Sequence, residues 1–107
     1  MVTAGELDQR IVIEAVIEGT GPYGGVETVW SEFASVWARV IPLRGDESFE
    51  AARTNAVRVI KVKLRWLDGV RTTMRLVWRG ETYDIADVDE SGRRKGELWL
   101  MAKARGV

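Results

Sequence analysis

Histidine and cysteine are both absent from the sequence. Their absence excludes disulfide bonds, thiolate nucleophiles and imidazole bases, and it removes the usual ligands of zinc and haem. Proline occurs only twice, and no uncharged apolar run is long enough to cross a bilayer. Residues 1–10 also lack the hydrophobic stretch of a signal peptide. We therefore expect a soluble protein of the cell interior that is poorly equipped for catalysis.

The 107 residues are enough for one domain, residues 1–107, with one modest core. Sixteen basic and sixteen acidic residues cancel, so no overall field attracts nucleic acid or an anionic membrane. The charge is nevertheless segregated, with a net −6 in residues 1–52, +7 in residues 53–79 and −1 in residues 80–107. Either the first two segments neutralise each other within one fold, or the acidic surface of one copy meets the basic surface of the next.

Apolar and polar residues alternate with a period of two along most of the chain, which predicts a mostly β protein. The expected strands cover residues 9–17, a weak stretch at 29–30, then 35–41, 56–67, 71–79, 81–86 and 97–102. Residues 18–25 are rich in glycine and predict a loop. Residues 45–54 are the only helix-like stretch, with Asp46 as the N-cap and acidic residues in the first turns.

A hairpin with a three-residue turn, residues 67–69, is expected to join the strands at 56–67 and 71–79. This turn length places Val62 opposite Met74, so that the apolar residues of both strands share one face. It also places Gly69 in the left-handed conformation that such a turn requires.

A second hairpin, with the two-residue turn Arg79-Gly80, is expected to place Leu76 opposite Tyr83 and Met74 opposite Ile85. Three strands would then share one apolar face. A slip of one residue would exchange the two faces of a strand, so the apolar pattern selects this register.

The first hairpin brings like charges together. It places Arg65 opposite Arg71 and Lys61 opposite Arg75, which is unfavourable. Three interpretations stay open: the long side chains splay into water, acidic groups cover them, or they face nucleic acid. The acidic groups would come from another subunit or from the first half of this chain.

Sites for ions and for acid–base chemistry are weakly indicated. Residues 87–92 match the first six positions of a calcium-binding EF-hand loop, but the twelfth position, which requires a bidentate glutamate, is Leu98. We interpret this segment as a solvated turn. The glycine-rich residues 21–25 lack the lysine of a phosphate-binding loop and predict a mobile loop. Asp84 and Asp87 show no sign of burial and do not predict an acid–base pair.

The five tryptophans divide by the same strand pattern. Trp66 and Trp78 fall on the expected apolar face, which predicts a place in the core. Trp30, Trp37 and Trp99 are not assigned by the pattern, and one of them is available for a subunit interface.

Three motifs occur in order along nearly the whole chain. They are Met1-x-x-Ala4-Gly5-x-Leu7-Asp8-x-Arg10, Trp37-Ala-Arg-Val-x-Pro42-Leu-x-Gly45-x-Glu47 and Arg75-Leu-Val-Trp-Arg-Gly80-x-x-Tyr83-x-Ile85. Together they resemble the tailed-phage head–tail joining proteins, also called stopper, head-closure or head completion proteins. One departure is the end of the chain, where Lys103 and Arg105 stand in place of acidic residues.

The resemblance implies a small β-barrel. Combined with the strand pattern, the expected fold class is all-β, with about six to seven mostly antiparallel strands and one short helix in a long loop. The resemblance implies a ring of about six or twelve copies at the virion head–tail junction, made in the host bacterial cytoplasm. Its partners would be the portal-adaptor ring, the tail terminator or tail tube protein, and the packaged DNA. It implies no enzyme activity, no cofactor and no membrane partner, and it leaves open whether the particle is a phage, a prophage remnant or a gene transfer agent.

The residues that we expect at a subunit interface or facing DNA are all charged. They are Arg44, Asp46, Glu47, Glu50, Arg53, Arg58, Lys61, Lys63, Arg65, Arg71 and Arg75. Residues 44–55 are expected to form an exposed loop with a short helix that points into the channel or clamps the ring above, so that Arg44, Arg53 or Arg58 approaches DNA phosphates. The other interpretation is a helix that covers one end of the barrel, with Phe49 and Ala52 packed inward.

Two other classes of function compete with this one. A small nucleic-acid-binding barrel of the OB type would use the face that carries Lys61, Lys63, Arg65 and Arg75, and its monomer would bind with steep salt dependence. A carboxylate hydrolase is the third class, and the absence of histidine and cysteine counts against it.

Overall fold

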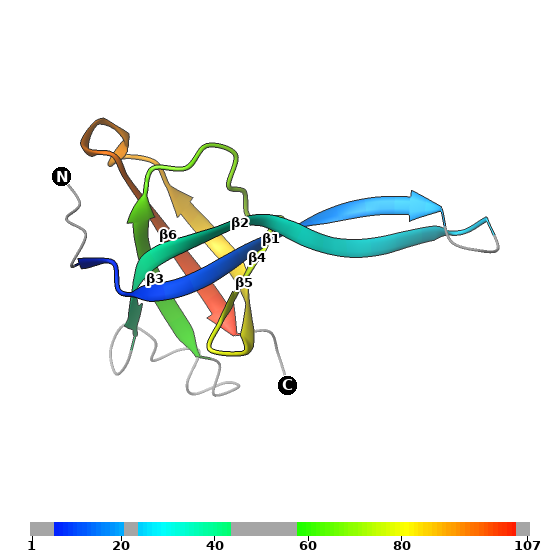
Figure 1. The fold of residues 1–107 in the computed structure, drawn as a ribbon, viewed down its shortest axis with the longest axis horizontal. Coiled ribbons are helices and arrows are strands. Elements are labelled where there is room, and N and C mark those ends of the chain that lie inside the picture. The colour runs from blue at the N-terminus through cyan, green and yellow to red at the C-terminus, as the bar shows by residue number, and fades with distance from the viewer. Residues whose placement is uncertain (1–5, 21–23, 44–57, 105–107) are drawn as a thin grey trace.

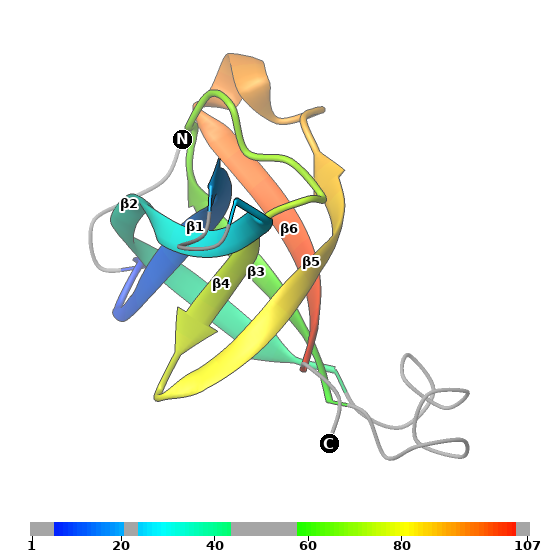
Figure 2. The ribbon, with the colours of Figure 1, turned by 90° about the vertical axis from the view of Figure 1, so that its right-hand side faces the viewer.

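A closed β-barrel with a long projecting hairpin is the fold of the computed structural model, which describes residues 6–20, 24–43 and 58–104 (Figures 1 and 2). The strands are β1 (Gln9–Thr20), β2 (Val26–Pro42), β3 (Val59–Arg65), β4 (Arg75–Trp78), β5 (Glu81–Asp89) and β6 (Glu97–Ala104). They follow one another around the barrel in the order β1-β2-β3-β6-β5-β4, and every pair is antiparallel. The predicted all-β barrel is confirmed.

Helical structure is scarce in the described residues. They contain the 3-10 turn η3 (Arg93–Lys95) and no α-helix. Across those same ranges, no helix has the length and apolar character needed to cross a membrane. The short helix expected in residues 45–54 lies outside the described residues.

The hairpin of β1 and β2 is longer than the sequence pattern predicts. β1 continues to Thr20 and β2 begins at Val26, so strand replaces residues 18–20 of the loop expected over 18–25. The weak and strong strands expected at 29–30 and 35–41 are one continuous strand of 17 residues. The pairing of β1 with β2 shifts by one residue. Ile13 of β1 pairs with Ala34 of β2, whereas the next residue, Glu14, pairs with Glu32. Phe33 is the extra residue of this bulge, and the shift lets the alternation of faces continue on either side of it.

Side chains that point into the barrel form one core with members from all six strands. The largest of those that are almost fully buried are Tyr83, Ile11, Ile13, Ile60, Leu64, Leu76, Leu98, Leu100 and Val62. In β1, β3 and β6 they occupy every second position, because alternate side chains of a strand point to opposite faces. The apolar pattern therefore predicted the inward faces correctly.

The hairpin expected between residues 56–67 and 71–79 is wrong. β3 pairs with β2 and β6, so Val62 lies opposite Val40 and Leu100 rather than Met74. The chain after β3 instead crosses the end of the barrel, where Val70 and Met74 are buried in the core. These two side chains provide the physical reason: folding the segment back along β3 would leave that end of the core open.

Both turns nevertheless take the predicted local conformation. Gly69 is left-handed, with φ of +90°, and an added Cβ would lie 3.1 Å from the ring of Phe33. The second hairpin is confirmed, with Leu76 opposite Tyr83. Its turn residues Arg79 and Gly80 both have positive φ, as a two-residue hairpin turn requires.

Substitution of a core leucine tests the barrel assignment. Leu100→Ala removes a side chain that is 1% exposed, and we expect it to lower the free energy of unfolding by about 2–5 kcal/mol. Lys103→Ala is the matched control, because Lys103 lies on the same strand and is exposed. Urea denaturation measures both variants, and equal losses of stability would contradict the assignment of the inward face.

Candidate functional site

The like-charge pairs expected on the basic segment do not form. Because β3 pairs with β6, Arg65 lies opposite Glu97, an acidic residue. Because β4 pairs with β1 and β5, Arg75 lies opposite Glu14 on one side and Asp84 on the other. The strand order thus gives each of these arginines acidic neighbours. It also separates Arg75 from Lys61, which lies on β3.

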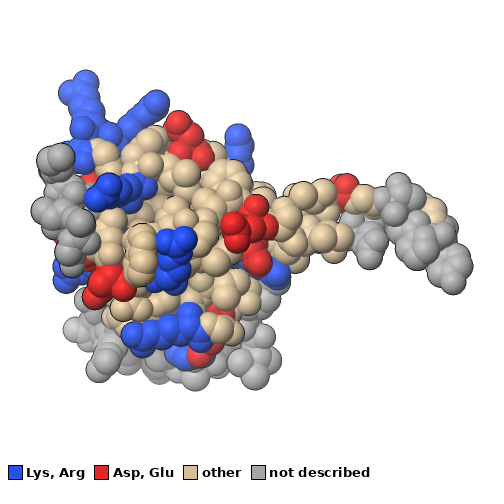
Figure 3. All heavy atoms as spheres, viewed as in Figure 1, with Lys and Arg blue, Asp and Glu red and all other residues tan. Residues whose placement is uncertain are grey.

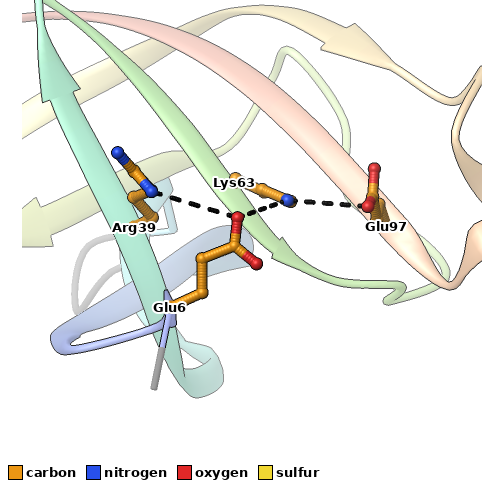
Figure 4. Close-up of polar contacts among 4 residues, drawn as sticks. All are labelled: Glu6, Arg39, Lys63 and Glu97. Carbon is orange, nitrogen blue, oxygen red and sulfur yellow. Dashed lines mark hydrogen bonds and ion pairs between the residues drawn. The ribbon is translucent and has the colours of Figure 1, made fainter. Parts of the chain in front are cut away.

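Lys63 lies at the centre of an ionic cluster on the outer face of the barrel (Figure 4). Its Nζ donates a hydrogen bond of 2.8 Å to Oε1 of Glu6 and lies 3.5 Å from Oε1 of Glu97. Nη1 of Arg39 lies 3.9 Å from the same Glu6 oxygen. The Lys63 side chain is only 11% exposed. The cluster ties the segment before β1 to β2, β3 and β6.

The pKa of Lys63 is raised above its ordinary value of 10.5, chiefly because its ammonium donates a hydrogen bond to Glu6. The negative charges of Glu6 and Glu97 act in the same direction, whereas burial opposes them. The folded state therefore holds this proton more tightly than the unfolded chain does. The resulting stability is present below pH 10.5 and is lost as the pH rises through the folded-state pKa.

The other basic residues predicted for the site in and around β3 do not share one surface, and each has different neighbours. Lys61 lies over the ring of Trp99, with its Nζ 4.7 Å from the ring centroid, and Lys63 approaches the same ring at 5.6 Å. Arg58 forms an ion pair with Glu81 at the end of the barrel. Arg71 is exposed in the connection between β3 and β4.

Arg75 lies where the projecting hairpin leaves the barrel. Its Nε donates a hydrogen bond of 2.7 Å to Oε1 of Glu14 on β1. Its guanidinium also lies over Trp30 of β2, with Cζ 4.1 Å from the ring centroid. One side chain of β4 therefore contacts both strands of the hairpin at its base.

The structure brings only part of the predicted charged set together. On the face of the barrel that Figure 3 presents, basic side chains are spread out with acidic ones among them. Two contacts, Lys63 with Glu6 and Arg75 with Glu14, join the acidic first segment to the basic one. This agrees with neutralisation within one fold. The predicted site residues Arg44, Asp46, Glu47, Glu50 and Arg53 lie outside the described residues, and their assignment stays a prediction.

A groove of about 580 Å³ lies beside the start of β1 and the end of β3. Apolar side chains form most of its lining: Leu7, Val36, Trp37, Trp66 and Leu67. Arg10 and Arg65 line it as well. Trp37 is 54% exposed, although tryptophan is one of the largest apolar side chains. Sequence reasoning missed this groove, because its walls come from three segments that only the fold brings together.

The tryptophans expected in the core are only partly buried. Trp66 and Trp78 pack against the core cluster, and each also donates a hydrogen bond from its Nε1. Trp66 donates to Asp68 at 2.9 Å, and Trp78 donates to Gln9 at 3.1 Å. Both rings therefore lie at the edge of the core, where the indole nitrogen reaches a polar partner.

The segment that begins like an EF-hand loop is part strand and part turn. Asp87 and Asp89 belong to β5, and Oδ1 of Asp89 accepts a hydrogen bond of 2.9 Å from the backbone N–H of Ser91. Hydrogen bonding by Ser91, chiefly from its side chain and then from this backbone N–H, lowers the pKa of Asp89. Over the described ranges, no group of three or more potential metal-binding side chains is present.

Comparison with known proteins gives one family and several solved structures of similar fold. A family model described as phage head completion protein matches residues 2–105. The solution structure of protein SF1141 from Shigella flexneri 2a has a TM-score of 0.74 and 17% identity, over 96% of each chain. A chain from the virion of a native gene transfer agent particle has a TM-score of 0.64 and 18% identity, over 94% of this chain and 97% of that one. No curated protein matches the sequence.

Removing the acidic partner of Lys63 tests the ionic cluster. We expect Glu6→Gln to lower the free energy of unfolding at pH 7, because Lys63 then lacks its closest carboxylate. The difference from the wild-type protein should shrink above pH 10.5, as Lys63 loses its proton. Urea denaturation over this pH range measures it, with the exposed Asp8→Asn as the control. Equal stability of Glu6→Gln and wild-type protein at pH 7 would contradict the cluster's role.

Substitution of Arg75 tests the anchoring of the hairpin. A charge-assisted hydrogen bond at a partly exposed site contributes about 1 kcal/mol, so Arg75→Gln should speed amide exchange at residues 15–19 about fivefold. The exposed Arg79→Gln is the control, since it removes the same charge at the far end of β4. Hydrogen exchange followed by mass spectrometry gives the rates. A uniform increase throughout the barrel would argue against a local role.

Proposed function

The chain belongs to the phage head completion protein family, and we propose that it acts as a ring-forming stopper at the head–tail junction. The family consists of structural components of the virion, and we propose no catalytic step. In the proposed role, the ring closes the DNA-filled head and gives the tail its docking surface. The observation that carries the proposal is the family match itself, because residues 2–105 include every described element of the fold.

The barrel supports this role through its shape. A ring built from one kind of subunit needs two different surfaces on each copy, which meet head to tail. The hairpin of β1 and β2 projects from one side of the barrel (Figure 1), and the groove beside the start of β1 lies away from it. These two features give the subunit the asymmetry that ring assembly requires. The expected partners remain an adaptor ring on the head side and a terminator or tube protein on the tail side.

Direct binding of nucleic acid by a single barrel is less well supported. The face invoked for it carries Lys61, Lys63, Arg65 and Arg75. Lys63 and Arg75 form ion pairs with glutamates. Arg75 also lies on β4, which is not a neighbour of β3 in the barrel. Neutralised cations add little to phosphate binding, because affinity follows the number of phosphates that free cations neutralise. We therefore propose contact with DNA only for the assembled ring, at its channel.

Deletion of the gene in the strain that makes the particle tests the proposal. We expect negative-stain electron microscopy of the lysate to show detached tails beside untailed heads, many of them empty. A plasmid copy of the wild-type gene is the control and should restore tailed particles. Intact tailed particles in normal numbers after deletion would overturn the stopper assignment. Steeply salt-dependent DNA binding by the purified monomer would then favour the nucleic-acid-binding barrel.

A further inference from the structure

Beyond Glu14, the outer part of the β1–β2 hairpin has no barrel strand beside it. We call residues 14–20 and 26–32 the arm, with Glu14 at its base. β1 pairs with β4 only from Val12 to Glu14, and β2 pairs with β3 only from Ala38 to Pro42. The arm is therefore a two-stranded ribbon that extends from the barrel, as Figure 1 shows. A two-stranded hairpin alone is marginally stable in water, so the arm gains from a surface to pack on.

Both faces of the arm carry apolar side chains. Ile17 pairs with Val29 on the face that continues the inward stripe of β1, and these side chains are 55% and 47% exposed. Val16 pairs with Trp30 on the other face, and Val16 is 38% exposed. β-Branched residues exposed on both faces of a projecting ribbon are unusual for a solvated hairpin, which normally has one polar face. The pattern is typical of a strand pair that is covered on both sides.

The charges of the arm are all of one sign. Every charged residue in it is a glutamate. Glu14 at the base is bonded to Arg75, whereas Glu18 and Glu32 are exposed. Figure 3 shows acidic atoms on the arm, and residues 14–20 and 26–32 contain no lysine or arginine. A partner surface should therefore be apolar at its centre and basic at its edges.

The groove on the barrel has these properties. Its floor and walls are mainly apolar, and the exposed Trp37 belongs to it. Its charged lining residues in the described part of the chain are Arg10 and Arg65. The guanidinium of Arg10 lies 5.3 Å from the ring centroid of Trp37, and Nε of Arg10 donates a hydrogen bond of 2.9 Å to Ser35. The arginine is therefore held at the groove beside an aromatic ring that a second chain can cover.

We infer that the arm of one copy docks into this groove on a neighbouring copy. Within one chain, Ile17 lies seven residues along the extended β1 from Arg10, which is about 23 Å. The arm points away from its own groove, so the contact joins different copies. Such a contact uses two different surfaces and closes into a ring when the rotation allows. The inference rests on the proposed function, because the ring supplies the neighbour.

Cross-linking in assembled particles tests the contact. The natural chain has no cysteine, so engineered cysteines are the only ones that it contributes. Ile17→Cys combined with Trp37→Cys places one thiol on the arm and one in the groove, both at exposed positions. After treatment of purified particles with a short bis-maleimide, an immunoblot should show a ladder of linked copies. Either cysteine alone should give no ladder, because each copy then has one reactive position.

A second cysteine pair repeats the cross-linking test, and a control pair measures linkage that does not come from the proposed contact. Val29→Cys with Arg65→Cys repeats the test at two other exposed positions. Ile17→Cys with Lys103→Cys is the control, because Lys103 lies opposite Val59, at the other end of β3 from Arg65. Contact raises the local thiol concentration, so we expect the test pairs to give at least about tenfold more linked copies than the control.

The outcomes separate this inference from the proposed function. If the wild-type protein is missing from tailed particles, the proposed function fails, and the inference fails with it. If the protein is present but both pairs give no more self-linking than the control, the inference is overturned and the stopper role stands. Linkage of the arm cysteine to a different virion protein would also overturn it, since the arm would then dock outside its own ring.

Discussion

The antiparallel pairing of β3 with β6 is the constraint on which the rest of the structure depends. It joins the two halves of the strand order, β1-β2-β3 and β6-β5-β4, and the pairing of β1 with β4 completes the circle. Closure removes the sheet edges of the barrel and surrounds one core with all six strands. The connection after β3 is then free to cross the barrel end, where Val70 and Met74 extend the core.

The same pairing decides the electrostatics of the surface. If β3 and β4 were neighbours in the expected hairpin, Arg65 would lie opposite Arg71 and Lys61 opposite Arg75. Around the closed barrel, they are interleaved with acidic residues from β1, β5 and β6 and from the segment before β1. Charges that are segregated along the sequence are thus brought next to opposite charges in the folded barrel. Lys63, with its two glutamate partners, shows this most clearly.

The arm is the one part of the hairpin that this closure does not support. Inside the barrel, the alternating side chains of β1 meet a core, and Ile11 and Ile13 are fully buried. Beyond the bulge at Phe33 the alternation continues, but Ile17 and Val29 meet water. Apolar side chains kept on an unsupported ribbon have a cost in solution, which assembly with a second surface offsets. Arg75, bonded to Glu14 and stacked on Trp30, holds the base of that ribbon to the barrel.

The sequence by itself determined most of the strand positions, their inward faces, and the conformations of Gly69 and of the Arg79-Gly80 turn. Each of these depends on residues close together in the chain, where period-two alternation and turn chemistry act directly. The family resemblance depends instead on three motifs in order along the chain. Only the tertiary structure decided which strands are neighbours, and hence which carboxylates meet Lys63 and Arg75 and which side chains line the groove at Trp37. The turn at 67–69 fits a hairpin as well as a barrel-end crossing, and no local pattern distinguishes them. The choice is made by burial of the whole core, which residues far apart in the sequence share.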